Sequence, residues 1–243
     1  MVERNSDISL DLRHVVVMLG SFPALSGLDL ECRAGEIVLV QGPNGAGKTT
    51  LLKVCAGLLA IRSGTATVLG FDLRDRRRDV RRDVRRRVGL LGHVGFLYDD
   101  LTVEDNVRFA VRANGGDPSE VGAVLARLGL DGRLARLPVA ACSAGQRRRT
   151  SLALVVARRP KLWLLDEPHA NLDRETRNLL DSIVRDAASA GATVLVASHD
   201  DDRGGALATR FVTVAGGHVI DDVAAHSATV PDAAVELAAV HGS

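Results

Sequence analysis

A glycine-rich loop, Gly42-Pro-Asn-Gly-Ala-Gly-Lys-Thr49, limits the folds open to this chain more than any other stretch. It fits the phosphate-loop pattern G-x-x-x-x-G-K-[ST]. The apolar run Glu36–Gln41 before the loop predicts a buried strand, and Leu51–Leu59 after it has apolar residues at helical spacing. Strand, glycine loop and helix in this order are the context that the motif needs. The structural alternative is a glycine-rich turn that happens to contain a lysine.

The residue types of this loop suit the phosphates of a nucleotide. Its glycines let successive backbone N–H groups turn inward as an anion-binding nest, and the start of the helix adds a partial positive charge. Lys48 is expected to reach the β- and γ-phosphates, and Thr49 to hold Mg²⁺. ATP and Mg²⁺ are therefore the expected ligands, and the expected nucleotide contacts in the loop are Gly42, Pro43, Asn44, Gly45, Ala46, Gly47, Lys48, Thr49 and Thr50.

Composition argues against several classes of protein. With 46% hydrophobic and 25% charged residues the chain is typical of soluble globular proteins, and its net charge of +1 argues against wholesale nucleic-acid binding. The three cysteines, Cys32, Cys55 and Cys142, have no C-x-x-C spacing, which favours reduced thiols over disulfides or a zinc site. Neither the apolar core of a signal peptide nor an apolar run near the roughly 20 residues that span a bilayer is found. Any membrane role is expected to come through a partner.

Strands and helices alternate along the chain, which predicts an α/β fold with a mostly parallel sheet between helices. From residue 103 to 158 the pattern is helical instead, so we expect an inserted helical subdomain. The expected domains are a core over 1–92 and 159–222, the helical subdomain over 93–158 and a C-terminal tail over 223–243. Besides 36–41, strands are expected at 9–18, 25–31, 65–69, 88–92, 161–166, 193–198 and 210–215, with a final hairpin ending at 218–221 and a helix over 174–190.

An arginine-rich segment runs from Arg74 to Arg87 and contains nine arginines and three aspartates. Val80, Val84 and Val88 lie four residues apart, which predicts an amphipathic helix with a thin apolar stripe. Its charged face is either a solvated surface or a contact for lipid headgroups or an acidic partner loop.

The stretch Leu162-Trp-Leu-Leu-Asp-Glu-Pro168 is an apolar strand that ends in two acids, the arrangement of a Walker B motif. Asp166 is expected to bind Mg²⁺, directly or through water. Glu167, one residue on, is expected to face the γ-phosphate and polarise the attacking water. The alternative is a strand-to-helix turn capped by acids.

A second helix start, Cys142-Ser-Ala-Gly-Gln-Arg-Arg-Arg149, precedes this strand. Ser143 can cap the helix, and Gly145 lets a phosphate approach closely. With the two acids downstream, the stretch resembles the signature motif of the ABC (ATP-binding cassette) ATPases. Ala170-Asn-Leu-Asp173 resembles their D-loop, and His199 matches their switch histidine, which contacts the γ-phosphate. The resemblance covers residues 8–222 and implies a P-loop NTPase of ABC type, with antiparallel strands at the N-terminus. Its further nucleotide contacts would be Ser143, Ala144, Gly145, Gln146 and Asp173.

The family resemblance also implies partners. The chain has one phosphate loop and one signature, so the nucleotide would be sandwiched between Lys48 of one protomer and Ser143–Gly145 of a second copy, in a homodimer or pseudo-two-fold heterodimer. The γ-phosphate would close this dimer and hydrolysis would reopen it. Integral membrane transporter subunits are the other implied partners, which would place the chain peripherally on the cytoplasmic face of the cell membrane.

Two positions depart from the family pattern. The adenine-stacking aromatic is replaced by Leu19, which leaves weaker apolar contact with the base. The Gln after the strand at 88–92 is replaced by His93. A neutral His93 could orient the attacking water, or it could point away and cap the strand end. A Gly-His pair here, with this form of the signature, resembles the group that provides the ATP-binding subunit of the haem exporter for cytochrome c maturation.

The leading hypothesis is an ATPase subunit that drives a membrane transporter. Phe96, Leu97 and Tyr98 lie in an expected loop between His93 and Leu101, so we expect them to form the coupling surface for a membrane subunit. They could instead pack under the helical subdomain. Alternatives for the whole chain are an exporter ATPase for lipid, drug or peptide, a soluble ABC protein acting on nucleic acid or ribosomes, and a non-hydrolysing regulatory module. No nucleic-acid partner is expected, and the intact set Lys48, Asp166, Glu167 and His199 argues against the regulatory module.

Overall fold

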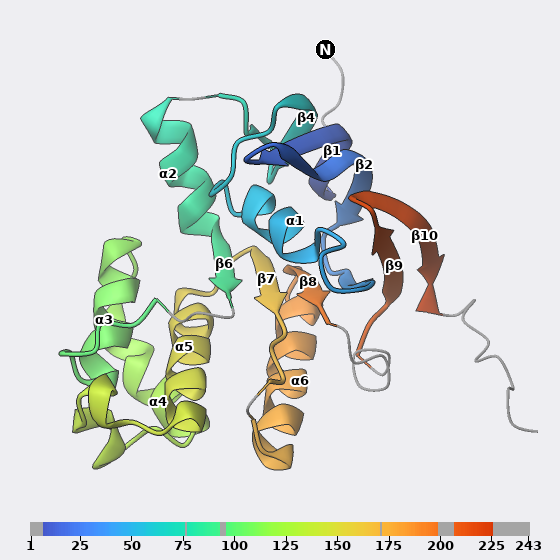
Figure 1. The fold of residues 1–243 in the computed structure, drawn as a ribbon. Helices are drawn as coiled ribbons and strands as arrows, with labels where there is room; N and C mark the ends of the chain where they lie inside the picture. The colour runs from blue at the N-terminus through green and yellow to red at the C-terminus, as the bar shows by residue number, and fades with distance from the viewer. Residues whose placement is uncertain (1–6, 76, 93–95, 171, 199–206, 226–243) are drawn as a thin grey trace, which may run out of the picture.

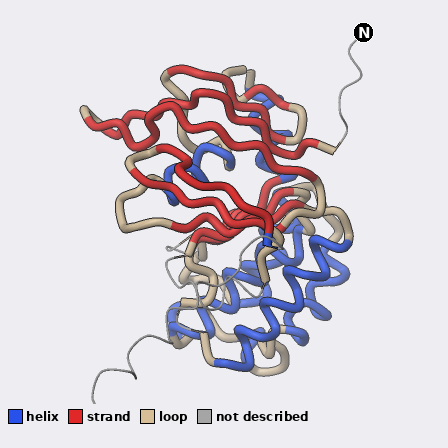
Figure 2. Tube along the Cα trace, turned by 90° about the vertical axis from the view of Figure 1, so that its right-hand side faces the viewer, coloured by secondary structure: helices blue, strands red, loops and turns tan. Residues whose placement is uncertain are grey.

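A computed structural model describes residues 7–75, 77–92, 96–170, 172–198 and 207–225 of the chain. Two sheets and helix α1 (Lys48–Cys55) form an upper lobe, and most of the other helices form a lower lobe (Figure 1). Seen from the side, the strands lie in layers above the lower helices, and a helix lies between the two strand layers (Figure 2).

The larger sheet has six strands in the order β10-β9-β3-β8-β7-β6. All neighbours pair in parallel except β9 and β10, which pair antiparallel. Every residue of β7 and β8 is buried, as expected for parallel strands covered on both faces. The mostly parallel sheet predicted from the sequence is confirmed. Its strands are β3 (Ile37–Gln41), β6 (Val88–Leu91), β7 (Leu162–Asp166), β8 (Thr193–Ala197), β9 (Arg210–Ala215) and β10 (His218–Ala224).

The smaller sheet is antiparallel, in the order β2-β1-β4-β5. Its inner face packs against α1 and the upper face of the parallel sheet in one hydrophobic cluster, which includes the fully buried Leu10, Leu28 and Leu51. The two sheets also meet at an edge, where Ser26 N–H donates to the Gly217 carbonyl at 3.0 Å. Its strands are β1 (Ile8–Leu19), β2 (Phe22–Arg33), β4 (Ser63–Val68) and β5 (Phe71–Asp72).

The helical region predicted between 103 and 158 is helical in the structure and makes up much of the lower lobe. Its core is continuous with the lower face of the parallel sheet, because Val107 and Leu152 belong to the same hydrophobic cluster as Trp163. No described helix combines the length and the apolar character that crossing a bilayer requires. The helices besides α1 are α2 (Arg78–Arg87), α3 (Val103–Ala113), α4 (Val121–Arg127), α5 (Ala144–Arg158) and α6 (Arg174–Ser189), with 3₁₀ turns at Pro118–Glu120, Leu134–Arg136 and Val139–Ala141.

Helix α1 ends earlier than the apolar spacing through Leu59 suggests. Gly57 takes the left-handed φ of +66°. Its N–H donates to the Val54 carbonyl at 2.8 Å, and Leu58 N–H donates to the Lys53 carbonyl at 2.9 Å. This closure satisfies the last carbonyls of the helix and stops it at Cys55.

The arginine-rich helix starts four residues later than the segment 74–87 predicts. Asp72 and Asp75 accept hydrogen bonds from the backbone N–H groups of Arg74 and Arg77, so the first residues form turns instead of a helix. Of the predicted apolar stripe, Val84 is buried and Val80 is half-buried within α2, whereas Val88 begins β6.

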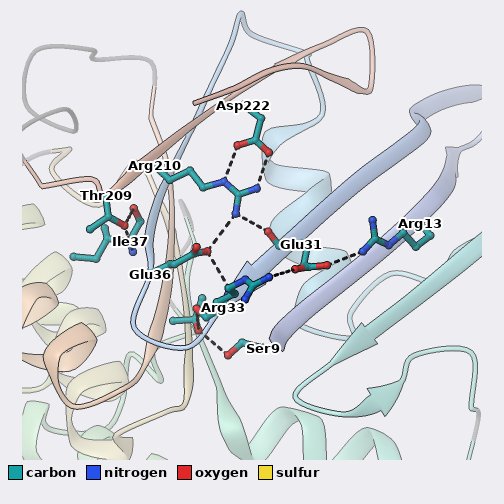
Figure 3. A network of polar contacts seen from close by, with 10 residues as sticks. Ser9, Arg13, Glu31, Arg33, Glu36, Ile37, Thr209, Arg210 and Asp222 are labelled. Carbon is teal, nitrogen blue, oxygen red and sulfur yellow. Dashed lines mark hydrogen bonds and ion pairs between the residues drawn. The ribbon is translucent and has the colours of Figure 1, made fainter. Parts of the chain in front are cut away.

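The last described strand runs two residues into the segment 223–243 that the sequence analysis assigns to a C-terminal tail. Strand β10 continues through Ala224, because Val223 pairs with Phe211 and Ala224 pairs with Arg210. Arg210 anchors this edge through a network that Figure 3 shows: two of its nitrogens contact the Asp222 carboxylate at 2.6 Å, and a third donates to the Glu31 carbonyl. These contacts raise the pKa of Arg210, chiefly through the hydrogen bonds with Asp222. Arg210 also donates to the Glu36 carboxylate at 3.3 Å. Because Arg210 begins β9 and Glu36 directly precedes β3, the network lies at the amino ends of these strands, and we interpret it as structural.

Candidate nucleotide site at the carboxyl ends of the strands

The glycine loop joins the end of β3 to the start of α1 and is tightly packed on one side. At Gly42, φ is +135° and a Cβ atom would lie 2.0 Å from the Val214 carbonyl oxygen. At Gly47, φ is +109° and a Cβ would lie 2.6 Å from the Ala24 carbonyl oxygen. Gly47 is the N-cap of α1 and offers no side-chain cap, so backbone N–H groups of the first turn are left for an anion.

Lys48 keeps its charged end at this loop. Its side chain is only 9% exposed, and Nζ donates to the carbonyl oxygens of Gly42 at 2.5 Å and Pro43 at 3.1 Å. Phosphate oxygens would replace these neutral acceptors with charged ones, which form stronger hydrogen bonds. The position and charge of Lys48 therefore fit a phosphate-binding role.

Thr49 and Asp166 come together although 117 residues separate them. The Thr49 hydroxyl donates to Asp166 Oδ2 at 2.9 Å. Asp166 is 7% exposed and ends β7, whose carboxyl end lies at the same edge of the sheet as that of β3. Mg²⁺ is bound by hard oxygen ligands, usually one or two from the protein with the rest from phosphates and water. A hydroxyl and a carboxylate in contact fit that donor set.

Glu167 follows Asp166 in a constrained turn. Its φ of +46° is left-handed, although a residue before proline normally adopts an extended conformation. Its N–H donates to the Ala197 carbonyl at 2.9 Å, and the Ser198 hydroxyl donates to its carboxylate at 3.3 Å. Backbone strain of this kind persists only where the surroundings impose it, and it is concentrated at functional sites.

The predicted signature residues begin α5 in the lower lobe, whereas the glycine loop lies in the upper lobe (Figure 1). Ser143 caps the helix as expected, since its hydroxyl accepts from Gln146 N–H at 3.3 Å and its own N–H donates to the Gln146 side chain at 2.8 Å. Ser143 and Ala144 are exposed, and Gly145 and Gln146 are half-buried. The four residues thus form one helix start, but not one site with Lys48 and Asp166.

Asp173 caps helix α6 and is exposed. Hydrogen bonds from the backbone N–H and the hydroxyl of Thr176 lower the pKa of the Asp173 carboxyl. His169, which was not singled out from the sequence, connects the segment before α6 to that helix, because its Nε2 lies 2.7 Å from the Asp181 carboxylate.

Three expectations concern other positions. His93 and His199 lie outside the described residues, so their roles stay predictions. Leu19 pairs with Phe22 across the β1–β2 hairpin, and these side chains are 49% and 79% exposed. Phe22 therefore places an aromatic ring beside the position where adenine contact is expected. The tight Gly20-Ser21 turn, which sets this pairing, was the sequence signal for it.

Two more residues at the site were not expected from the sequence. Ser198 is recognisable only by its contact with Glu167. Arg148 donates to the backbone carbonyls of Asp166 and Glu167, but its neighbours Arg147 and Arg149 are also arginines, so no sequence signal distinguishes it.

Comparisons with known proteins agree with this geometry. The family described as ABC transporter matches residues 25–170. The cytochrome c biogenesis ATP-binding export protein CcmA of Rhodopseudomonas palustris (strain BisB18) is 40% identical over 180 residues, which cover 74% of this chain and 86% of that protein. A solved ATP-binding subunit of an ABC transporter is 26% identical with a TM-score of 0.81, and the match covers 88% of this chain and 89% of that one. A dimeric bacterial ABC transporter cassette has the same fold, with a TM-score of 0.82 and 24% identity over 89% of this chain and 98% of that one.

Proposed function

This chain belongs to the ABC transporter family as an ATP-binding, ATP-hydrolysing subunit, and on that premise we propose that it powers export by a separate membrane subunit in cytochrome c biogenesis. The observation that carries the enzymatic part is the hydrogen bond between Thr49 and Asp166, which joins the phosphate loop to the acidic strand end. The 40% identity with a CcmA protein supports the export process, and the earlier resemblance of the His93 region supports haem as the cargo.

We assign the phosphate chemistry to four side chains and the contact with the base to two more. Lys48 exchanges the Gly42 and Pro43 carbonyls for the β- and γ-phosphates of ATP. Thr49 and Asp166 hold Mg²⁺, which when bound neutralises phosphate charge. Glu167 orients the attacking water and accepts its proton as the general base. Leu19 and Phe22 supply apolar contact for the adenine.

The proposed role in cytochrome c biogenesis is tested by complementation. A bacterium that lacks its own CcmA is expected to regain c-type cytochromes when it carries this chain together with haem-export membrane subunits from the same source. Covalently bound haem, measured by staining after denaturing electrophoresis, should return to near the parental level. The Glu167→Gln variant should restore less than about a tenth, because export needs hydrolysis. Normal export of a lipid, drug or peptide without any cytochrome recovery would reject haem export.

A groove between the two lobes supports a membrane partner. Exposed Phe96 (67%), Tyr98 (56%), Phe109 (50%) and Leu58 (48%) line it, and Arg85 of α2 contributes to its wall. Tyr98 is fixed, since Asn106 bonds to both its N–H and its carbonyl, and its ring meets that of Phe109 edge-on at 5.3 Å. An exposed apolar groove with ordered walls suits one face of an amphipathic helix.

The expected coupling surface is thus partly revised. Phe96 and Tyr98 are exposed as proposed, but Leu97 is half-buried and packs on the hydrophobic core of the lower lobe, as the packing alternative expects. We propose that the groove, and not the loop alone, receives a coupling helix of the membrane subunit. Leu58 and Phe109 were not expected there, because they come from distant parts of the chain.

Phe96→Ala and Tyr98→Ala are expected to weaken capture of the membrane subunit by about 10-fold each, because aromatic side chains dominate binding at interface centres. The ATPase rate of the isolated chain should not change. Affinity purification from detergent, with quantification of the membrane subunit, measures the effect. Ile220→Ala is the matched control, since Ile220 is 64% exposed on β10 and does not line the groove. Unchanged capture by both aromatic variants would place the contact elsewhere.

A further inference from the structure

We propose that Arg148 is a positioning residue for ATP hydrolysis, which holds the backbone of Asp166 and Glu167 and ties it to the helix that begins at Ser143. The inference rests on the proposed role of Glu167 as general base. Arg148 lies in the second turn of α5, so its guanidinium reaches from the helical lobe to the carboxyl edge of the parallel sheet.

The contacts of Arg148 converge on one edge of the sheet. Nη2 donates to the carbonyl oxygens of Asp166 at 3.0 Å and Glu167 at 2.7 Å. Nη1 donates to the Gly92 carbonyl at 2.6 Å, directly after β6. Guanidinium is a rigid planar fork of donors, so one side chain fixes the ends of two neighbouring strands relative to each other.

The turn that Arg148 holds would not keep its shape unaided. Glu167 has a left-handed φ of +46° directly before Pro168. Such a conformation persists only where the surrounding contacts impose it. Ala197 accepts from the Glu167 N–H, and Arg148 donates to the Glu167 carbonyl, so this residue is fixed from both sides. Loss of the Arg148 contact would let the carboxylate of Glu167 shift away from the attacking water.

The charge of Arg148 also suits this place. Burial lowers its pKa, while the nearby negative charges of Asp166 and Glu167 raise it. Arginine stays protonated in proteins near neutral pH, so it brings a permanent cation against the acidic strand end. Its hydrogen bonds within the described chain all go to backbone carbonyls, which makes it a support for the acids and not a substitute for their metal contacts.

In a sandwich of two copies, Arg148 would connect the two nucleotide sites. The start of α5 is proposed to contact the nucleotide of the partner copy, whereas Glu167 acts on the nucleotide of its own copy. A shift of α5 on closure would reach Glu167 through Arg148, which gives coupling between the two sites a defined physical contact.

Arg148→Met is expected to lower kcat for ATP hydrolysis by about 10- to 100-fold, the cost of a misplaced reacting group, with KM for ATP within about two-fold of the parent. Arg158→Met is the matched control. Arg158 also lies on α5, donates to two backbone carbonyls, those of Arg85 and Val88, and has its pKa lowered by burial. Arg158 contacts the amino end of β6, away from Glu167. Its replacement should therefore lower the thermal midpoint as much as Arg148→Met does, but leave kcat unchanged.

Arg148→Lys keeps the charge but replaces the fork by a single ammonium, and is expected to lose only about 3- to 10-fold in kcat. If Arg148→Met does not fold, Arg148→Lys provides the test of the positioning role. Parental kcat in folded Arg148→Met overturns the inference. Where Arg148→Met does not fold, parental kcat in Arg148→Lys overturns it. An equal loss of kcat in Arg158→Met also overturns it. Glu167→Gln is measured alongside: retained hydrolysis there rejects the base assignment itself, which separates the two failures.

Discussion

Replacement of Glu167 by Gln is expected to lower steady-state ATP hydrolysis by on the order of 10²-fold or more while ATP still binds, because an amide cannot accept the proton of the attacking water. The change is nearly isosteric, so the contacts of the Glu167 backbone with Ala197 and Arg148 should be preserved. Phosphate release under saturating ATP measures the rate, and a fluorescent ATP analogue measures binding. With turnover blocked, ATP should hold two copies together, visible as a dimer in size-exclusion chromatography.

Two controls separate this effect from others. Glu175→Gln changes an exposed carboxylate in the first turn of α6 and should hydrolyse ATP like the parent. Lys48→Ala should lose binding as well as turnover, since the charge at the glycine loop is removed. If Glu167→Gln turns over at the parental rate, another group is the base.

Ser143→Arg should lower the rate of ATP hydrolysis by on the order of 10²-fold or more, without weakening ATP binding to the single copy. Ser143 is exposed at the start of α5 in the lobe opposite the glycine loop, so its long, bulky replacement leaves the phosphate loop untouched (Figure 1). It would block approach of this helix start to the nucleotide of a partner. Binding is measured by titration with the ATP analogue, and hydrolysis by phosphate release.

Ser119→Arg is the matched control, because Ser119 is likewise exposed at the start of a helical turn in the same lobe. It should retain parental activity. Mixing Ser143→Arg with Lys48→Ala offers a sharper test. A two-fold sandwich formed from these two variants pairs the intact glycine loop of one chain with the intact Ser143 of the other, so one complete site forms and hydrolysis should partly return. Full activity of Ser143→Arg on its own would contradict the sandwich.

Much of this protein is determined by short stretches of its sequence. The glycine loop, the apolar strand that ends in Asp166 and Glu167, and the serine cap of α5 each depend on neighbouring residues only. Their local geometry follows from backbone freedom, side-chain period and capping. For the same reason the order of strands and helices predicted a mostly parallel sheet. Boundaries were less well predicted, because the glycine closure after α1 and the aspartate turns before α2 override the apolar period.

Only the tertiary structure decided which distant residues meet. The motifs assigned both Thr49 and Asp166 to Mg²⁺, but their direct hydrogen bond depends on the order of strands in the sheet, which no local pattern encodes. Arg148 is one of three consecutive arginines. Only the direction in which its side chain leaves α5 brings it to the Glu167 carbonyl. The groove likewise joins Leu58, Phe96 and Phe109 from separate elements. Local interactions set what each segment forms, but the burial of shared apolar faces sets where the segments lie, and the site is assembled by that second step.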